Sequence, residues 1–465
     1  MNAPDGVSHP PDGGRDEARS SSPNLAWVFG LQRFGIRTGL DTVRELLRRL
    51  GSPQSKMDTV LVGGTNGKGS VARLLAASLQ AAGVSTGLFT SPHLQYVGER
   101  AVVNGVPATE AEMESLAAAV RADAEELEAT FFEVMTAMSL LRFARARADV
   151  AVLEVGMGGR LDATNAVDPR LCIITNVALD HTAILGASEA EIAAEKAGIM
   201  RPGVPLLTGA TGAALSVVEE RAREMVAPLF SLGRQLQVVD RVDQHGVAGW
   251  DGLGLELSWQ AVHEPLAPPV LRQPGTLALT SPLVGPHQAD NIALAAFGAL
   301  LLGVEGGAVQ EAVAATRWPG RLDRRSYRGR HVVLDGAHNQ AAATALATAL
   351  ARLEGQAAVM ILGISADKDV RAVLSELTGL ARHVIFTAAV RSPRSATGGD
   401  LQEVWRGLGE VPEAEVVEGP AAALRRALEL TEPGETVVVA GSLFLVAEAS
   451  DLLDGRTGEP YERWQ

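Results

Sequence analysis

Cysteine is almost absent from this chain of 465 residues, in which Cys172 stands alone. An internal disulfide and a zinc site built from several thiolates are therefore excluded, and a reducing compartment fits. The sequence also lacks any run of roughly 18 consecutive apolar residues, the length that a membrane-spanning helix needs. Lysine and arginine are dispersed, and the formal net charge is −14. We therefore expect a cytoplasmic protein that binds small molecules, with neither nucleic acid nor a membrane as a partner. We also expect a monomer, an expectation that does not derive from composition or charge.

Glycine, in contrast, is abundant, with 49 residues, and one glycine-rich segment, Gly64-Thr65-Asn66-Gly67-Lys68-Gly69-Ser70, follows a short apolar run and precedes an Ala- and Leu-rich stretch. Glycines let backbone N–H groups approach an oxyanion closely, and the N-terminus of the following helix adds positive potential. Lys68 supplies a positive charge, and Ser70 could bind a magnesium ion. Because Gly69 separates Lys68 from Ser70, the spacing departs from the usual G-x-x-x-x-G-K-[ST] pattern. The segment predicts a variant phosphate-binding loop.

Continuous apolar runs alternate with helical stretches along the chain, a pattern typical of parallel strands covered on both faces. The predicted fold class is α/β, with a large P-loop-type domain on a mostly parallel sheet and a smaller Rossmann-like C-terminal α/β domain. We expect a disordered leader at 1–23, the large domain at 24–316, a hinge at 317–325 and the C-terminal domain at 326–465, with a small antiparallel excursion at 230–285. The expected strands are Thr59–Val62, Ser85–Thr90, Val150–Val155, Leu171–Asn176 and Val204–Thr208, then His331–Leu334, Ala358–Leu362, His383–Thr387 and Thr436–Ala440.

Polar residues follow several of these strands, at the sheet edge where ligands of open α/β folds bind. Glu154 ends one strand of the large domain, and His181 comes shortly after the next. A buried carboxylate can be a paired structural charge, and a lone histidine is usually a hydrogen-bonding residue. Beside a nucleotide loop, however, oxygen ligands with one imidazole suit magnesium or manganese. Asp335 and His338 repeat this pattern after a strand of the second domain.

Two further cations are candidates for the same region. Lys196 lies four residues after Ile192, on the apolar face of a short predicted helix. It could extend its amine to solvent as lysines normally do, or it could be carbamylated and so become an anionic metal ligand. The residues alone leave both open. Arg321, in the expected hinge, could bring a guanidinium to phosphates when the domains close.

Several motifs together resemble those of the folylpolyglutamate synthase/dihydrofolate synthase family, within the Mur-ligase superfamily. The likeness runs from about Leu25 to the C-terminus, and the motifs occur in the family's order. They are Gly64–Ser70, Thr90-Ser-Pro-His-Leu94, Phe131-Phe-Glu133, Glu154-Val-Gly-Met-Gly-Gly-Arg-Leu-Asp-Ala-Thr-Asn165, Asp180-His181, Glu195-Lys-Ala-Gly-Ile199, Pro319-Gly-Arg321 and Leu334-Asp-Gly-Ala-His-Asn339.

The resemblance implies an ATP-dependent ligase that adds L-glutamate to dihydropteroate and to tetrahydrofolate through an acyl phosphate, with an ATP-binding central domain and a glutamate-binding C-terminal domain. A monofunctional enzyme is the alternative. A cell-wall Mur ligase would use a UDP-linked substrate, and no separate UDP-binding domain is visible before the phosphate loop. A nucleotide-dependent switch would leave Glu154, His181 and Lys196 unexplained.

The resemblance also implies roles for single residues. Lys68, Lys196, Arg321 and His338 would take part in catalysis, and Lys196 matches the lysine that is carbamylated in related enzymes. The remaining assignments place ATP on Gly64, Thr65, Asn66, Gly67, Lys68, Gly69, Ser70, Asn291, Arg321 and Asp335, one Mg²⁺ on Ser91, Glu154 and His181, a second on Ser70 and Glu154, the pterin on Phe131 and Phe132, and the incoming glutamate on His338 and Ser442. One departure is Phe444, where relatives often carry tyrosine.

Overall fold

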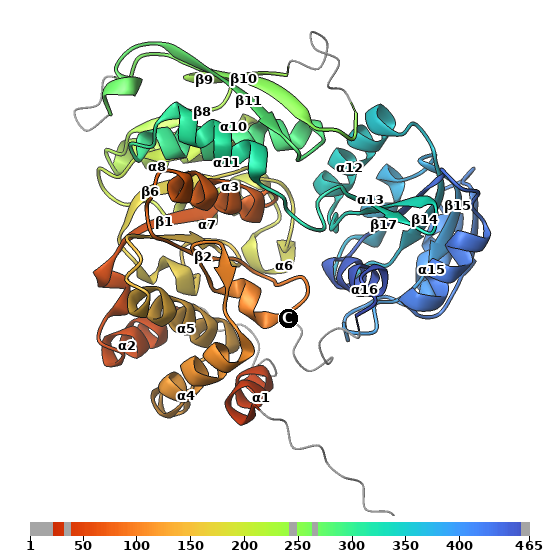
Figure 1. The fold of residues 1–465 in the computed structure, drawn as a ribbon, viewed down its shortest axis with the longest axis horizontal. Helices are drawn as coiled ribbons and strands as arrows, with labels where there is room; N and C mark the ends of the chain where they lie inside the picture. Colours follow the sequence, from red (N-terminus) through yellow and green to blue (C-terminus); the bar gives the residue numbers. More distant parts are fainter. Residues whose placement is uncertain (1–21, 32–38, 241–248, 263–267, 457–465) are drawn as a thin grey trace, which may run out of the picture.

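The computed structural model describes residues 22–31, 39–240, 249–262 and 268–456. They form a large α/β unit and a smaller C-terminal α/β unit beside it (Figure 1). The expected fold class is confirmed. Residues 1–21 of the expected leader lie outside the described residues, and the first helix begins at Pro23.

The large unit is built on an eight-stranded sheet in the order β4-β3-β2-β5-β1-β6-β7-β8. The pairs β2–β3 and β3–β4 are antiparallel, and all other pairs are parallel. The central strand β1 lies between β5 and β6, so the segments that follow these three strands meet at one edge of the sheet. The strands are β1 (Asp58–Gly63), β2 (Thr86–Phe89), β3 (Val102–Val103), β4 (Val106–Pro107), β5 (Val150–Glu154), β6 (Pro169–Ile174), β7 (Leu206–Thr208) and β8 (Leu229–Ser231).

Helices cover both faces of this sheet, which explains why its strands read as continuous apolar runs. Val60 and Val62 pack with α3, α10 and α11, whereas Leu61 between them packs with α1, α2, α4 and α5. The helices are α1 (Pro23–Gly30), α2 (Asp41–Arg49), α3 (Lys68–Ala81), α4 (Glu110–Glu126), α5 (Phe131–Arg145), α6 (Thr182–Leu185), α7 (Glu189–Ala197), α8 (Gly212–Glu224), α10 (Pro286–Leu301) and α11 (Gly306–Ala315), with 3₁₀ segments at Pro53–Lys56, Val97–Arg100, Ala163–Ala166 and Pro269–Leu271.

A separate antiparallel sheet lies over α10 and α11, within the segment where the sequence predicts an antiparallel excursion (Figure 1). Its strands are β9 (Leu236–Asp240), β10 (Leu253–Trp259) and β11 (Gly275–Ser281), in the order β11-β10-β9. Alternate residues of β10 are buried, as expected for a strand with one covered face. Phe297 of α10 joins this sheet to the main core, with ring centroids 6.3 Å from Trp259 and 5.5 Å from Phe230.

The C-terminal unit is a six-stranded sheet in the order β12-β13-β17-β14-β15-β16, parallel except for the β12–β13 hairpin. Helices α12 to α14 pack on one face, and α15 and α16 pack on the other. The strands β12 and β16 were not expected, and β12 overlaps the expected hinge. The elements are β12 (Asp323–Tyr327), β13 (Arg330–Leu334), α12 (Gln340–Leu353), β14 (Ala357–Leu362), α13 (Val370–Glu376), β15 (Ala381–Phe386), α14 (Gly398–Arg406), β16 (Glu413–Val416), α15 (Pro420–Glu429), β17 (Thr436–Ala440) and α16 (Leu443–Leu453).

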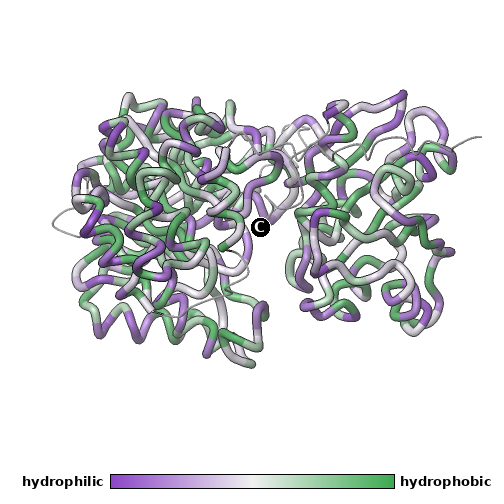
Figure 2. Tube along the Cα trace, turned by 90° about the horizontal axis from the view of Figure 1, so that it is seen from below, coloured by the Kyte–Doolittle hydropathy of each residue, from purple (hydrophilic) through white to green (hydrophobic). Residues whose placement is uncertain are grey.

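Seen from below, the two units lie side by side with a narrower region between them (Figure 2). Each unit has apolar clusters of its own on the two faces of its sheet. Among the described helices, none combines the length and apolar character that crossing a membrane requires. Direct contacts link the units as well: Leu94 packs against the apolar cluster under α16, and the Gln95 amide donates to Ser450 Oγ at 3.2 Å.

We predict that Phe297→Ala lowers the free energy of unfolding of the large unit by about 3–5 kcal/mol, because it removes a fully buried ring that joins two sheets. Denaturant unfolding followed by tryptophan fluorescence measures the change. Val106→Ala, at a side chain that is 62% exposed, is the control and should cost about 0.5 kcal/mol or less. Equal effects of the two substitutions would contradict a structural role for this contact.

Candidate active site

The glycine-rich loop requires glycine for steric reasons. Gly64 and Gly67 have φ angles of +138° and +81°, which other residues rarely adopt. A Cβ atom at Gly64 would lie 1.9 Å from Thr175 Oγ1, and one at Gly67 would lie 2.2 Å from Asn291 Oδ1. Gly67 is the N-cap of α3, so the first residues of that helix face the space beyond the loop. This arrangement presents a helix N-terminus and nearby backbone N–H groups to an anion.

The additional glycine, Gly69, is explained by its neighbours. A Cβ atom at this position would lie 3.2 Å from a ring carbon of Trp318 and 3.4 Å from Glu154 Oε2. A Cβ atom there would crowd the Trp318 ring and come into van der Waals contact with Glu154. Glycine therefore lets the Trp318 ring lie close to the first turn of α3.

A cavity of about 420 Å³ opens beside the loop. Every residue that the sequence associates with the nucleotide, a metal or catalysis lines it. These are the whole loop Gly64–Ser70 with Ser91, Glu154, His181, Lys196, Asn291, Arg321, Asp335 and His338. The cavity thus collects side chains from both α/β units, and we call it the nucleotide cavity.

Lys68 and Glu154 lie in this cavity with little solvent around them. Lys68 Nζ donates to the carbonyl of Thr65 at 3.0 Å, and Glu154 Oε2 accepts from the backbone N–H of Ser91 at 2.9 Å. Burial lowers the pKa of Lys68 although Glu154 and Asp180 favour its charge. Burial also raises the pKa of Glu154, against the opposing charge of Lys68. Phosphate oxygens near Lys68 and a cation near Glu154 would each restore the charged form.

The residues expected to hold magnesium fit that ion. Ser70, Ser91 and Glu154 offer oxygen ligands, and burial lowers the pKa of His181, which favours the neutral imidazole that metals bind. In the described part of the chain, no group of three or more His, Cys, Asp or Glu side chains is arranged for a metal. Magnesium usually takes a few protein ligands and completes its shell with water and substrate phosphates.

Lys196 points into the nucleotide cavity rather than to the surface. Its Nζ donates to the carbonyl of Gly64 at 2.8 Å, and the side chain is buried. Burial first, and then the nearby charge of Lys68, lower the pKa of Lys196 to about 7. Near neutral pH a substantial fraction of this amine is therefore uncharged.

The C-terminal unit contributes a rigid turn after β13. The two carboxylate oxygens of Asp335 accept backbone N–H groups of Leu322 and Ala337, both at 2.9 Å. These bonds hold the segments that carry Arg321 and His338. Burial lowers the pKa of His338 to about 4, and its Nδ1 lies 2.8 Å from the carbonyl of Gly336. A neutral ring that donates from Nδ1 leaves Nε2 as an acceptor.

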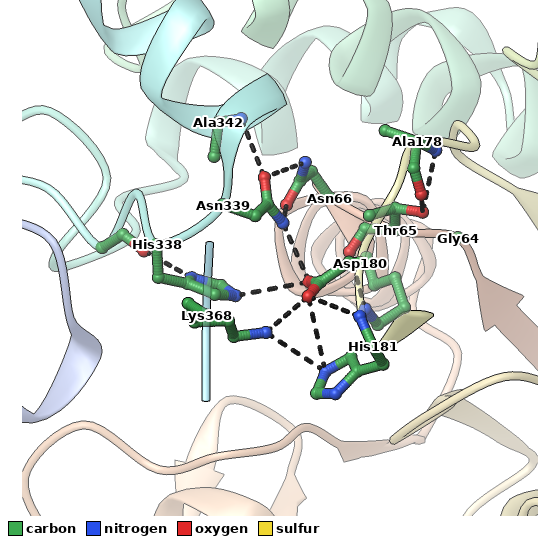
Figure 3. Close-up of polar contacts among 12 residues, drawn as sticks. Gly64, Thr65, Asn66, Ala178, Asp180, His181, His338, Asn339, Ala342 and Lys368 are labelled. Atoms are coloured by element: carbon green, nitrogen blue, oxygen red, sulfur yellow. Dashed lines mark hydrogen bonds and ion pairs between the residues drawn. The ribbon is translucent and has the colours of Figure 1, made fainter. Parts of the chain in front are cut away.

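A polar cluster centred on Asp180 joins the two units (Figure 3). Lys368 Nζ lies 2.5 Å from Asp180 Oδ1, and Asn339 Nδ2 donates to Asp180 Oδ2 at 2.9 Å. Asn339 and Asn66 also exchange amide hydrogen bonds of 3.0 and 3.1 Å. Burial alone would raise the pKa of Asp180, but the positive groups around it, above all Lys368, hold that pKa well below its usual range. Asp180 of the large unit is therefore ionised, and its side-chain partners Lys368 and Asn339 come from the C-terminal unit.

A second cavity, of about 690 Å³, lies beside the first and is lined by Phe131, Phe132 and Phe444. We call it the acceptor cavity. A Cβ atom at Gly156 would lie 2.4 Å from the ring of Phe132, so glycine lets this ring pack close to the end of β5. The two cavities meet, because six residues line both of them: Ser91, Pro92, Gly156, Met157, Gly158 and Leu185.

Comparisons with known proteins agree on one family. Residues 62–206 match the Mur ligase middle domain, and residues 320–443 match the Mur ligase, glutamate ligase domain. A Bacillus subtilis protein named dihydrofolate synthase/folylpolyglutamate synthase is 30% identical, over 91% of this chain and 96% of its own length. This chain belongs to the dihydrofolate synthase/folylpolyglutamate synthase family.

Other relatives extend this result. A protein named probable bifunctional folylpolyglutamate synthase/dihydropteroate synthase, from Haloferax volcanii, is 37% identical over 91% of this chain, and the chain spans 49% of its length. The structure of Escherichia coli FolC in complex with DHPP and ADP has a TM-score of 0.81 and 31% identity, covering 94% of this chain and 98% of that one. A Yersinia pestis member of the family, complexed with AMPPNP and Mn ion, has a TM-score of 0.79 and 30% identity, covering 93% and 98%.

The sequence predictions missed three residues that join the two units at the site, and one residue that they assigned to the site lines neither cavity. Asp180 and Asn339 stand inside motifs but were given no role, and no role was predicted for Lys368 either. A signal was available, since the chain has only four lysines, and Lys68, Lys196 and Lys368 all lie at this cleft. Ser442 lines neither cavity. Its hydroxyl caps α16 by accepting from the backbone N–H of Phe444 at 3.2 Å.

We predict that Lys368→Met separates the two units and lowers turnover about tenfold or more, because Asp180 loses its closest cation while 91% of its side chain stays buried. Small-angle X-ray scattering measures the first effect, as a larger radius of gyration, and steady-state kinetics measures the second. Lys56→Met, at the remaining, exposed lysine, is the matched control. Unchanged scattering and turnover in Lys368→Met would contradict the role of the Asp180–Lys368 ion pair in holding the two units together.

Proposed function

We propose that this chain is an ATP-dependent ligase that joins L-glutamate through an amide bond to dihydropteroate and, in a second activity, to tetrahydrofolate and its polyglutamates. The observation that carries the proposal is the meeting of the two cavities at Ser91 and Gly156–Gly158, beside Glu154. A nucleotide on the glycine-rich loop and a pterin among the phenylalanines would bring a phosphate and a carboxylate together there.

The first step transfers a phosphate. The acceptor carboxylate attacks the terminal phosphorus of ATP, the bond to the bridging oxygen breaks, and ADP leaves with that electron pair. Lys68 and Arg321, which line the nucleotide cavity, would offset the charge on the phosphate chain. Magnesium, held by Ser91, Glu154 and His181 and at a second site by Ser70 and Glu154, would neutralise phosphate oxygens when bound.

The second step forms the amide. The amine of glutamate attacks the acyl carbon, a tetrahedral intermediate collapses, phosphate leaves and the nitrogen loses a proton. With its pKa near 4, His338 is neutral, and its Nε2 could accept a hydrogen bond from the amine and orient it. We retain Ser442, the N-cap of α16, as a predicted glutamate ligand. No covalent intermediate on the protein is required.

Relatives support this division of the site. The E. coli structure holds DHPP together with ADP, two ligands that match the two adjoining cavities in chemical character. The Y. pestis structure holds AMPPNP and a Mn ion, which supports a site for a divalent metal beside the phosphates. Because this chain spans about half of the H. volcanii relative, we propose for it only the ligase activity.

We also propose that the enzyme works as a monomer in the cytoplasm. Both units of this chain contribute residues to each cavity, which supports a site assembled within one chain. Cytoplasm provides ATP and glutamate together.

The decisive test is a dual-substrate assay of the purified protein with ATP, magnesium and glutamate. ADP should be released in a glutamate-dependent manner with dihydropteroate and also with tetrahydrofolate. Lys68→Ala should lower kcat/KM by at least about a hundredfold with the fold intact, because a cation facing the phosphates is lost, whereas Lys56→Ala should not.

Each other outcome has a distinct meaning. Turnover of one pterin substrate only would reduce the enzyme to a monofunctional one. Activity with UDP-linked acceptors alone would indicate a cell-wall ligase. Nucleotide binding without glutamate-dependent ADP release would indicate a switch protein.

We further propose that Lys196 is carbamylated in the working enzyme. Only an uncharged amine adds carbon dioxide, and the pKa near 7 makes this amine available at neutral pH. Carbamate and activity should therefore both decline as the pH falls below about 7. With ¹³C-bicarbonate, NMR should detect a carbamate carbon that Lys196→Arg lacks and Lys56→Arg keeps. An active enzyme without that signal would refute the modification.

A further inference from the structure

Three arginines line the acceptor cavity, and two of them are engaged. Arg100 Nε donates to His93 Nδ1 at 2.9 Å and its guanidinium lies over the ring of Phe131, at 5.3 Å. Arg160 forms an ion pair of 2.6 Å with Glu195. For the third, Arg394, the guanidinium makes no hydrogen bond or ion pair within the part of the chain that the structure describes, and the residue is exposed.

Arg394 differs from the other two in origin. It comes from the C-terminal unit, in the loop between β15 and α14, whereas most of the cavity belongs to the large unit. Its backbone is fixed, because its carbonyl accepts from the N–H of Ala366 at 2.7 Å. The same loop is held on α16 by Arg391, whose N–H donates to Glu448 at 2.8 Å and whose guanidinium binds Asp451 at 2.6 Å.

This end of α16 lies where the cavities adjoin. Leu443 lines the nucleotide cavity, and the next residue, Phe444, lines the acceptor cavity. The C-terminal unit therefore forms the wall near the point where an acceptor carboxylate would meet the phosphate. Arg394 adds to that wall a positive charge that has no ion-pair partner among the described residues.

The two proposed acceptors differ in their need for such a charge. Dihydropteroate ends in one carboxylate, which is the group to be phosphorylated. A folate ends in a glutamyl residue, whose γ-carboxylate is phosphorylated while its α-carboxylate, a short carbon chain away, is left over. A second carboxylate in a partly apolar cavity needs a partner, and a guanidinium binds carboxylates through two parallel hydrogen bonds.

We propose that Arg394 binds the α-carboxylate of the terminal glutamate of folate substrates and so selects for glutamylated acceptors over dihydropteroate. This inference rests on the proposed ligase function. The two activities would then differ in their need for this side chain. Addition of the first glutamate does not use Arg394, whereas addition of later glutamates does.

The experiment compares wild type with Arg394→Gln and Arg394→Lys for three KM values: dihydropteroate, tetrahydrofolate and L-glutamate. Arg394→Gln should raise the KM for tetrahydrofolate about tenfold or more and leave the other two within about twofold. Arg394→Lys should recover part of the loss, because it keeps the charge but not the planar fork. Val390→Ala, on the same loop and 66% exposed, is the control.

The outcomes separate this proposal from the function on which it rests. Wild type without glutamate-dependent ADP release would refute the ligase itself. If wild type turns over only one acceptor, calorimetric affinities for both pterins in the presence of ADP make the same comparison. An equal loss for both acceptors, a loss confined to L-glutamate, or no change in a folded Arg394→Gln protein would each overturn the role of Arg394.

Discussion

One buried carboxylate determines how the two α/β units face each other. Asp180, which follows β6 in the large unit, is bound by Lys368 and Asn339 of the C-terminal unit, and Asn339 in turn bonds to Asn66 of the phosphate loop. An ionised carboxylate with little solvent needs these partners, and each of them would be left unsatisfied if the units moved apart. The positions of Arg321, His338 and Phe444 relative to the loop all depend on this contact. The same bonds that stabilise the closed arrangement thus assemble the site.

The nucleotide cavity contrasts with that contact, because its own charges are poorly balanced. Burial shifts Lys68, Lys196 and Glu154 toward their neutral forms. A protein that bound nothing here would gain from replacing them with apolar residues. Their presence is consistent with ligands that bring the missing charges, phosphate for the lysines and a divalent cation for the carboxylate. The site is therefore prepared electrostatically for metal and nucleotide rather than for water.

The sequence predicted well those features that depend on local chain geometry. The phosphate loop, Glu154 and His181 follow buried strands that are adjacent in the sheet, so the rule that ligands gather at strand ends brings them together. The Asp180–Lys368 pair was not predictable in this way, since Lys368 stands between two aspartates and resembles a solvated loop. Ser442 was assigned to the glutamate from a motif, and its hydroxyl also accepts the cap hydrogen bond of α16, so the glutamate assignment stays a prediction. Strands β12 and β16 were missed because they lie at the edges of their sheet and lack a continuous apolar run.

The acceptor cavity is lined by residues of both units, so a ligand bound there favours the closed arrangement of the units. Its aromatic floor, Phe131 and Phe132, belongs to the large unit, and its remaining wall includes Phe444 from the C-terminal unit. A ligand that touches both units binds the closed arrangement more tightly than the open one, and it shifts the population toward closure by that difference in affinity. Phenylalanine at position 444 contributes apolar contact to that difference but no hydroxyl. Arg394, on the loop that packs on α16, adds a polar group from the same unit to this wall.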